Sequence, residues 1–118
     1  MKVIIAGSRD FCHYTLLKSI MDECNKEYQF TEVVSGCARG ADKLGEQWAE
    51  EVGLPIKEFP ADWATYGKSA GSIRNRQMAE YTDTAYVFWD GKSRGSQDMV
   101  RQMSNAKKPC TLILDTSI

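Results

Sequence analysis

The fold is decided by one stretch of the chain, Val33-Val34-Ser35-Gly36-Cys37-Ala38-Arg39-Gly40-Ala41-Asp42. A short β-branched run breaks into a loop of small residues that carries one arginine, and a helical pattern follows directly. Small residues let backbone N–H groups approach a phosphate closely, and the following helix offers unpaired N–H groups and the positive end of its dipole. Arg39 adds a fork of charged donors. The stretch predicts a strand, an anion-binding loop and a helix, although an ordinary tight strand-to-helix turn has similar residues.

Two further segments have the same character. They are Ala6-Gly7-Ser8-Arg9-Asp10, after the first apolar run, and Trp89-Asp90-Gly91-Lys92-Ser93-Arg94-Gly95-Ser96, after the fourth. In an open parallel sheet, the loops that leave the carboxyl ends of the strands line one edge, and ligands bind there where the strand order reverses. We therefore expect three polar, glycine-bearing loops to meet at one cleft.

Apolar residues alternate between strand spacing and helix spacing along the whole chain. Strands are expected over residues 2–6, 31–35, 54–59, 84–89 and 109–114. Helices are expected over residues 17–28, 41–52, 70–81 and 96–106, with Gly53 and Pro55 ending the second. Such alternation implies a three-layer α/β fold, with a mostly parallel five-stranded sheet covered by helices on both faces. At 118 residues the chain is expected to form a single domain, residues 1–118.

The charge balance argues for a small anionic ligand. The formal net charge of −1 argues against a general nucleic-acid or membrane binder. Several cations nevertheless lie in or next to the candidate loops: Arg9, Arg39, Lys68, Arg74, Arg76, Lys92 and Arg94. No apolar run is long enough to span a bilayer, and the chain enters a strand at once without a signal peptide. We therefore expect a cytoplasmic protein that does not contact a membrane.

The cysteines do not indicate a metal site. Cys12, Cys24, Cys37 and Cys110 show no Cys-x-x-Cys pairing, and His13 is the one histidine. No metal and no cofactor are therefore expected. Cys24 and Cys110 have the spacing of core residues, whereas a reactive thiol at Cys37 would require a lowered pKa, of which the sequence gives no sign.

The connection over residues 59–75 is long for a strand-to-helix loop, and such loops are more often functional than idle. Trp63 and Tyr66 either stack on a planar base or plug the edge of the sheet. Lys68 is placed to meet a phosphate. Arg74 and Asn75 fall in the first turns of the next helix, from which they can point back into the cleft.

Neither standard phosphate motif is present. Gly7-Ser8-Arg9-Asp10-Phe11 stands where a dinucleotide fingerprint Gly-x-Gly-x-x-Gly would follow the first strand, and a Walker lysine loop is also missing. The phosphate interpretation therefore rests on loop geometry and residue type.

The motifs together resemble the YspA-type, YpsA-related branch of the SLOG superfamily, from the first strand to the last. The matching pieces are Gly7-Ser8-Arg9, Ser35 to Asp42, Asp62-Trp63, Tyr66-Gly67-Lys68, Ala70-Gly71, Arg74-Asn75 and Trp89 to Ser96. The superfamily includes the LONELY GUY phosphoribohydrolases and DNA-processing protein A. The resemblance implies a Rossmann-like fold and a nucleotide or nucleotide-derived ligand, such as an ADP-ribose-like molecule or a nucleotide second messenger. It also implies a homo-oligomer.

Two departures limit what the resemblance implies. The branch usually has a second glycine where Cys37 stands. The LONELY GUY enzymes carry Pro-Gly-Gly-x-Gly-Thr-x-x-Glu with a catalytic glutamate, whereas this chain has Met99 at that position and Asp98 one residue earlier. One residue turns a helix by about 100°, so Asp98 is expected to face away from the site.

Three functions remain open. The leading one is a non-catalytic nucleotide-binding domain that acts as a sensor or sequesterer. A second is a hydrolase that cuts an N-glycosidic or related bond, with Asp42, Asp90 or Asp98 as acid–base candidates. Binding of single-stranded nucleic acid is third, because stacking aromatics fit but an extended basic surface is missing. Arg39 and Arg74 are expected to bind phosphate directly, and Ser96 to cap the last helix. The expected ligand-binding residues are Gly7, Ser8, Arg9, Ser35, Gly36, Arg39, Gly40, Asp42, Trp63, Tyr66, Lys68, Arg74, Asn75, Asp90, Gly91, Ser93, Arg94, Gly95 and Ser96.

Overall fold

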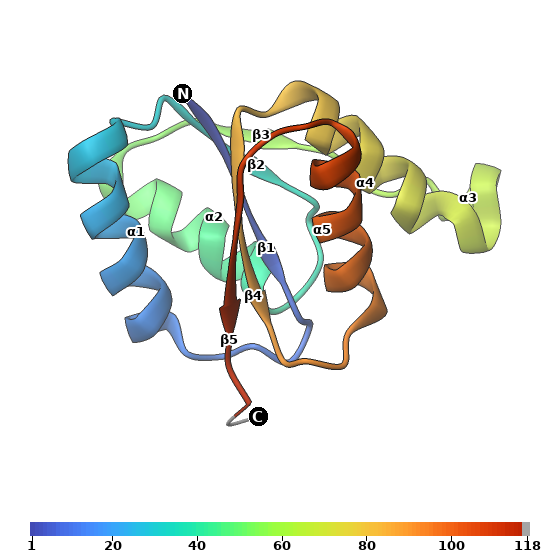
Figure 1. Ribbon diagram of the computed structural model, residues 1–118, viewed down its shortest axis with the longest axis horizontal. Helices are drawn as coiled ribbons and strands as arrows, with labels where there is room; N and C mark the ends of the chain where they lie inside the picture. The colour runs from blue at the N-terminus through green and yellow to red at the C-terminus, as the bar shows by residue number, and fades with distance from the viewer. Residues whose placement is uncertain (117–118) are drawn as a thin grey trace.

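The computed structural model describes residues 1–116 and has a five-stranded sheet at its centre (Figure 1). The strand order is β3-β2-β1-β4-β5, and every neighbouring pair is parallel. The predicted parallel sheet is therefore confirmed, with strand ends that differ by at most two residues. The strands are β1 (Lys2–Gly7), β2 (Glu32–Ser35), β3 (Ile56–Glu58), β4 (Thr84–Trp89) and β5 (Cys110–Leu114).

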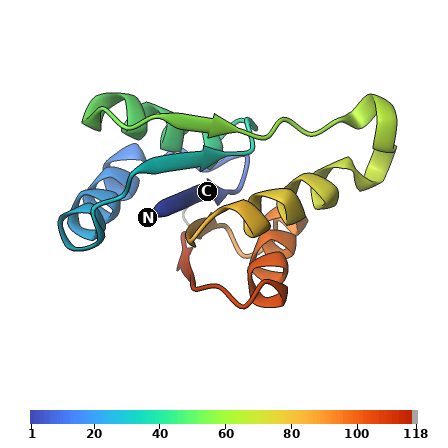
Figure 2. The same ribbon diagram turned by 90° about the horizontal axis from the view of Figure 1, so that it is seen from above.

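Helices cover both faces of the sheet, which confirms the three-layer, Rossmann-like fold. Figure 2 shows α1 (Tyr14–Tyr28) and α2 (Ala41–Val52) on one side. The other side carries α4 (Ala70–Tyr81) and α5 (Arg94–Asn105). None of the helices in residues 1–116 has both the length and the apolar composition needed to cross a membrane.

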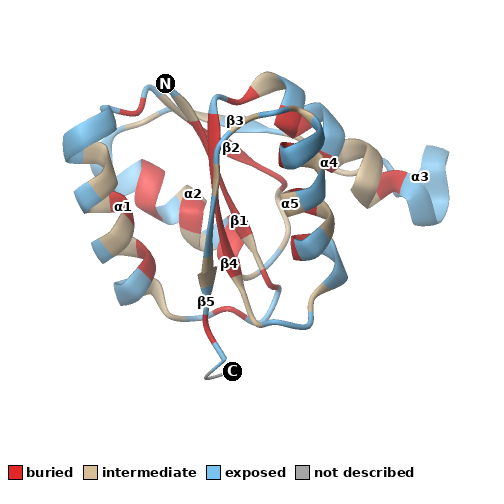
Figure 3. Cartoon of the chain, viewed as in Figure 1, coloured by how far each residue is buried: buried red, intermediate tan, exposed pale blue. Residues whose placement is uncertain are grey.

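The core has two halves because successive side chains of a strand point to opposite faces. Val3 and Ile5 of β1 pack with Trp48 of α2 on the first face. Ile4 of β1 packs with Met103 of α5 on the second face. Figure 3 shows the buried residues concentrated in the central strands. Burial on both faces explains why these strands read as continuous apolar runs.

The order of the strands reverses between β1 and β4, the position where open α/β sheets commonly bind ligands. The chain builds outward from β1 to β2 and β3, and then crosses to β4 and β5 on the other side. Loops β1–α1 and β4–α5 therefore diverge at the carboxyl edge of neighbouring strands, which leaves a crevice for a ligand. Loop β2–α2 begins beside them.

Two local features differ from the prediction. The long connection contains two short helices, α3 (Trp63–Tyr66) and η1 (Gly67–Ser69), and Figure 1 shows α3 projecting beyond α4, away from the sheet. Helix α5 begins at Arg94, and its N-cap is Ser93, whose side chain accepts a hydrogen bond from the Ser96 N–H. The predicted capping role of Ser96 is therefore wrong, because Ser96 lies inside the first turn and donates to the cap.

Candidate functional site

Three adjoining cavities open at the carboxyl edge of the sheet and together form a cleft. We call them the deep cavity, of about 300 Å³, the wide cavity, of about 710 Å³, and the side cavity, of about 380 Å³. Arg9 and Arg74 line all three. The two arginines therefore stand at the junction of the cleft.

The structure brings most of the predicted site residues into this cleft. The deep cavity is lined by Gly7, Arg9, Asp42, Arg74, Asn75, Ser93, Arg94, Gly95 and Ser96. The wide cavity adds Trp63, Lys68 and Asp98, and the side cavity adds Gly36 and Arg39. Segments from the β1, β2 and β4 loops and from α4 thus converge as a parallel sheet requires.

Some predicted residues instead hold the loops together. The Ser8 hydroxyl oxygen accepts from the Asp90 N–H at 3.0 Å, and the Ser8 carbonyl accepts from the Ala41 N–H at 3.3 Å. Gly40 has a φ of 80°, and a Cβ there would meet the Ser8 carbonyl oxygen at 2.4 Å. Ser8 and Gly40 line none of the three cavities. Their contacts join the β1, β2 and β4 loops into one unit.

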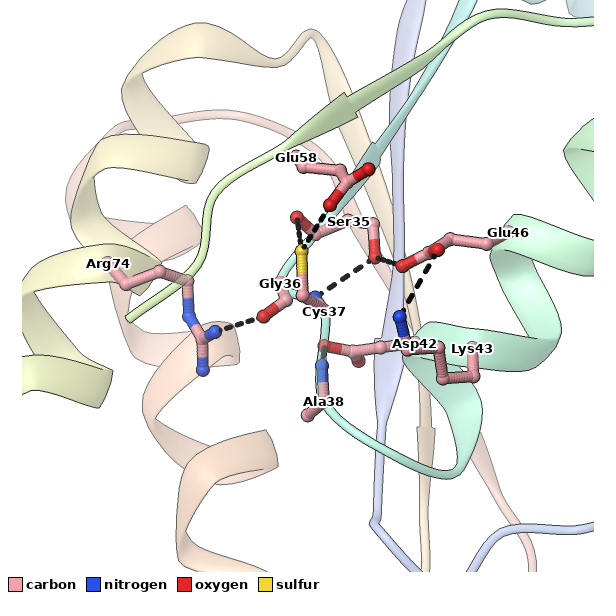
Figure 4. A network of polar contacts seen from close by, with 9 residues as sticks. All are labelled: Ser35, Gly36, Cys37, Ala38, Asp42, Lys43, Glu46, Glu58 and Arg74. Atoms are coloured by element: carbon pink, nitrogen blue, oxygen red, sulfur yellow. Dashed lines mark hydrogen bonds and ion pairs between the residues drawn. The ribbon is translucent and has the colours of Figure 1, made fainter. Parts of the chain in front are cut away.

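Ser35 also has a structural place. It is fully buried at the end of β2, donates to a Glu46 carboxylate oxygen at 2.6 Å, and accepts from the Cys37 N–H at 3.1 Å (Figure 4). These bonds shape the β2–α2 loop from beneath. Tyr66 and Gly91, both exposed, likewise line none of the three cavities.

Asp90 stabilises the β4–α5 loop and does not line the cleft. Its Oδ1 accepts from the Lys92 and Ser93 N–H groups, at 2.8 Å each. These backbone hydrogen bonds hold the pKa of Asp90 below its usual value. Asp90 lines none of the three cavities, so this acid–base candidate is placed away from the cleft.

Arg74 reaches across the cleft from α4 to the β2–α2 loop. Its Nη1 donates to the Gly36 carbonyl oxygen at 2.5 Å (Figure 4). Its Nε donates to Asn75 Oδ1 at 2.9 Å. A Cβ on Gly36 would lie 2.8 Å from Nη1. Glycine at this position therefore lets the guanidinium lie against the backbone.

From helical geometry we expected Asp98 to face away from the site, but the structure places it in the cleft. It lines the wide cavity, while the next residue, Met99, lines the deep one. Both face the cleft because it extends across adjoining faces of α5. The Asp98 carboxylate accepts from Ser72 Oγ at 3.1 Å, from Asn75 Nδ2 at 3.0 Å and from Arg101. This carboxylate thus ties α4 to α5.

Asp42 is the buried acid of the cleft. It is the second residue of α2, it is 5% exposed, and its Oδ2 accepts from the Ala38 N–H at 3.3 Å. Burial raises its pKa to about 6, against the lowering effects of the Ala38 N–H and the Arg74 charge. The carboxyl group can therefore change its protonation near neutral pH.

The cations of the cleft differ in how they are held. Within residues 1–116, the side chains of Arg9, Lys68 and Arg94 make no hydrogen bond or ion pair, and all three are exposed. Arg39 lies 3.6 Å from the Asp10 carboxylate, with both side chains about 75% exposed. The unpaired cations are available to an anionic ligand.

Cys37 occupies a strained position in the β2–α2 loop. Its φ of 66° falls in the left-handed region, which explains why glycine suits this position. Burial and the neighbouring Glu58 carboxylate raise the pKa of the thiol to about 11. The thiol is therefore protonated at neutral pH. No cluster of three or more His, Cys, Asp or Glu side chains suited to a metal occurs in residues 1–116.

Sequence reasoning missed several lining residues. Met78 and Met99 supply an apolar wall of the deep cavity, while Gln97 and Arg101 line the wide one. Gln97 and Arg101 stand one helical turn apart on α5, so helical spacing from the predicted loop would have found them. The methionines carry no such signal, because apolar helix positions usually belong to the core.

Comparisons with known proteins identify the family of this chain. The family model described as the YspA, cpYpsA-related SLOG family matches residues 1–66, which include the β1 and β2 loops. The chain is also 32% identical over 115 residues to the Gene 61 protein of Mycobacterium phage D29, and the match covers 92% of each chain. The chain therefore belongs to the YspA, cpYpsA-related SLOG family.

Proposed function

We propose that the protein binds a nucleotide or nucleotide-derived ligand in this cleft and acts as a sensor or sequesterer. An ADP-ribose-like molecule or a nucleotide second messenger is the expected class. The observation that carries the proposal is Arg74, fixed by Gly36 and Asn75 at the junction of three cavities. Arg9 and Arg94 stand unpaired beside it among the described residues.

The deep cavity supports a place for a phosphate. It lies at the start of α5, where Arg94 and Gly95 are the first two residues. The first N–H groups of a helix have no intrahelical partner, and the helix dipole favours an anion there. The wide cavity supports a place for a base, because Trp63 lines it with 52% of its surface exposed.

The proposal is tested with a panel of nucleotides, nucleotide sugars and cyclic nucleotides, by native mass spectrometry and then by calorimetry. Arg74→Ala should weaken the best binder by about 1.5 to 3 kcal/mol, the range for a hydrogen bond to a charged group. Arg76→Ala is the matched control, because Arg76 lies on the same helix but pairs with Glu80. If no panel member binds, or if the two variants lose equal affinity, the proposal is wrong.

A nucleotide hydrolase is the second candidate, and Asp42 is the observation that favours it. A buried carboxyl group with a pKa of about 6 inside a ligand cavity suits general acid–base catalysis. Asp98 and Asp90 are weaker candidates, because Asp98 pairs with Arg101 and Asp90 lines none of the three cavities. Product formation from the same panel, abolished by Asp42→Asn and kept by Arg76→Ala, would favour this function over pure binding.

We also propose a homo-oligomer that works in the cytoplasm. Edge strand β5 exposes Leu112 and Leu114, with 44% and 61% of their surfaces accessible. Exposed apolar edge strands tend to be covered by a partner. Light scattering across a concentration series measures the assembly, and a constant monomer mass would contradict it.

A further inference from the structure

Asp42 lines the deep cavity, in which we place the anionic group of the ligand. Among the described residues that line this cavity, Asp42 is the one acid, beside the cations Arg9, Arg74 and Arg94. A Cβ on Gly36 would lie 2.7 Å from Asp42 Oδ2 and 2.8 Å from Arg74 Nη1. The carboxylate and the guanidinium therefore border the same small space beside Gly36, and Figure 4 shows all three residues.

An anion bound by Arg74 brings like charge close to the Asp42 carboxylate. Asp42 is 5% exposed, so water screens this repulsion poorly. The anion also competes for the Arg74 charge, which is one of the groups that keep Asp42 ionised in the free protein. Both effects favour the protonated acid in the complex.

We propose that an anionic ligand and a proton enter the deep cavity together: Asp42 takes up the proton and donates the resulting O–H to a ligand phosphate oxygen. The inference rests on the proposed function and specifies how that site is regulated. The proton comes from solvent, and no covalent bond other than O–H forms. Because the pKa of Asp42 is about 6 in the free protein, a small rise in this pKa on binding is enough to protonate the carboxylate near neutral pH.

The charges around Asp42 decide how far this coupling goes. Arg74 faces it from α4 and favours the ionised form, while Arg9 from the β1–α1 loop and Arg94 from α5 line the same cavity. Glu46, one turn along α2, favours the protonated form. Glu46 does not line the cavity, and its carboxylate accepts from the Ser35 hydroxyl.

The test is calorimetry with ADP-ribose as probe, since its diphosphate has no group that titrates between pH 6 and 8. Titrations at one pH in two buffers of different ionisation enthalpy measure proton uptake directly. We expect up to one proton per site, and an affinity that falls by up to about tenfold per pH unit above pH 6. Affinity falls as pH rises because Asp42 binds its proton more tightly in the complex than in the free protein.

Two variants separate the outcomes. Asp42→Asn mimics the protonated acid, so it should bind ADP-ribose without proton uptake and without pH dependence. Glu50→Gln, on the same helix but exposed and outside the three cavities, should keep both. Should Asp42→Asn misfold, the carboxyl ¹³C shift of Asp42 in the wild type, titrated with and without probe, replaces it. Wild-type binding without proton uptake overturns this inference alone, whereas no binding of any panel member overturns the proposed function as well.

Discussion

The carboxylate of Asp42 and the guanidinium of Arg74 both border the space that a side chain on Gly36 would occupy. Asp42 Oδ2 and Arg74 Nη1 lie 2.7 and 2.8 Å from the point that a Cβ on Gly36 would occupy. The two charged groups belong to α2 and α4, on opposite faces of the sheet. A glycine in the β2–α2 loop thus sets the geometry of the cleft.

Gly36→Ala should therefore displace the end of Arg74, because a flexible side chain moves more easily than the backbone. We expect ligand affinity to fall by about 1.5 to 3 kcal/mol, the range for one hydrogen bond to a charged group. Calorimetry of a double-mutant cycle with Arg74→Ala measures the effect. If Gly36→Ala still weakens binding when Arg74 is already absent, the two positions act independently and the explanation fails.

Gly95 offers a way to close the deep cavity without harming the fold. It is exposed in the first turn of α5, and the nearest atom to a Cβ there is Ser93 Oγ at 4.0 Å. A leucine is therefore accommodated, but its side chain projects into the cavity. Gly95→Leu should abolish measurable nucleotide binding and leave the thermal midpoint unchanged within a few degrees.

Ser104→Leu is the control for this variant, because Ser104 is exposed near the other end of α5 and lines none of the three cavities. It should bind as the wild type does. Full binding by Gly95→Leu would mean that the ligand lies elsewhere.

The sequence predicted the fold well because the periodicity of apolar residues is a local signal. The helix over residues 70–81 and the strand over residues 84–89 end where the structure places them. The convergence of three loops followed from parallel topology alone. Helix α3 was missed because four residues are too few to show a period.

The roles of polar side chains were harder to predict because they depend on distant partners. The bond between Ser8 Oγ and the Asp90 N–H joins residues 82 positions apart, and nothing local distinguishes a hydroxyl that fixes a loop from one that meets a ligand. Asp98 was misplaced for a related reason: helical geometry gives its direction relative to Met99, but not the width of the cleft. Both cases need the tertiary structure.

Lys108 should contribute strongly to stability. Its ammonium group donates to the carbonyl oxygens of Ala79, Glu80 and Thr82, at 2.9, 2.8 and 2.7 Å. A cation at the end of α4 satisfies carbonyls that have no helical partner and also interacts with the helix dipole. Lys108→Met should lower the free energy of unfolding by about 1 to 3 kcal/mol in urea titrations.

Lys107→Met is the matched control, since Lys107 is the preceding residue and its exposed side chain has no hydrogen bond or ion pair within the described part of the chain. Its free energy of unfolding should change by less than about 0.5 kcal/mol. Equal losses in the two variants would show that the carbonyl contacts are not responsible.

Burial of Asp42 should make stability depend on pH. Its pKa is about 6 in the folded protein and near 3.8 in the unfolded chain. The folded state binds the extra proton between these values, so this contribution is complete below pH 3.8 and is lost as pH rises through about 6. Relative to Asp42→Asn, the wild type should lose roughly 2 to 3 kcal/mol between pH 4 and pH 7. Urea unfolding of both proteins at each pH measures this.

Asp22→Asn should behave in the opposite way. Hydrogen bonding from the Trp48 indole lowers the pKa of Asp22, so its contribution is present above the unfolded value and is lost as pH falls. A wild-type curve parallel to that of Asp42→Asn across the whole range would contradict the assignment for Asp42.

Ligand binding should respond to salt but not to chelators. The cleft presents Arg9, Lys68 and Arg94 as exposed cations, whose attraction for an anion is screened at high ionic strength. Raising NaCl from about 0.05 to 0.5 M shortens the screening length several-fold and should therefore weaken nucleotide binding. Arg74→Ala should still show part of this salt dependence, because the other cations of the cleft remain. Addition of EDTA at constant ionic strength should leave the calorimetric affinity unchanged, since arginines and lysines rather than a cation are expected to neutralise the phosphates. A loss of binding in EDTA that Mg²⁺ restores would mean that a bridging metal ion takes that role.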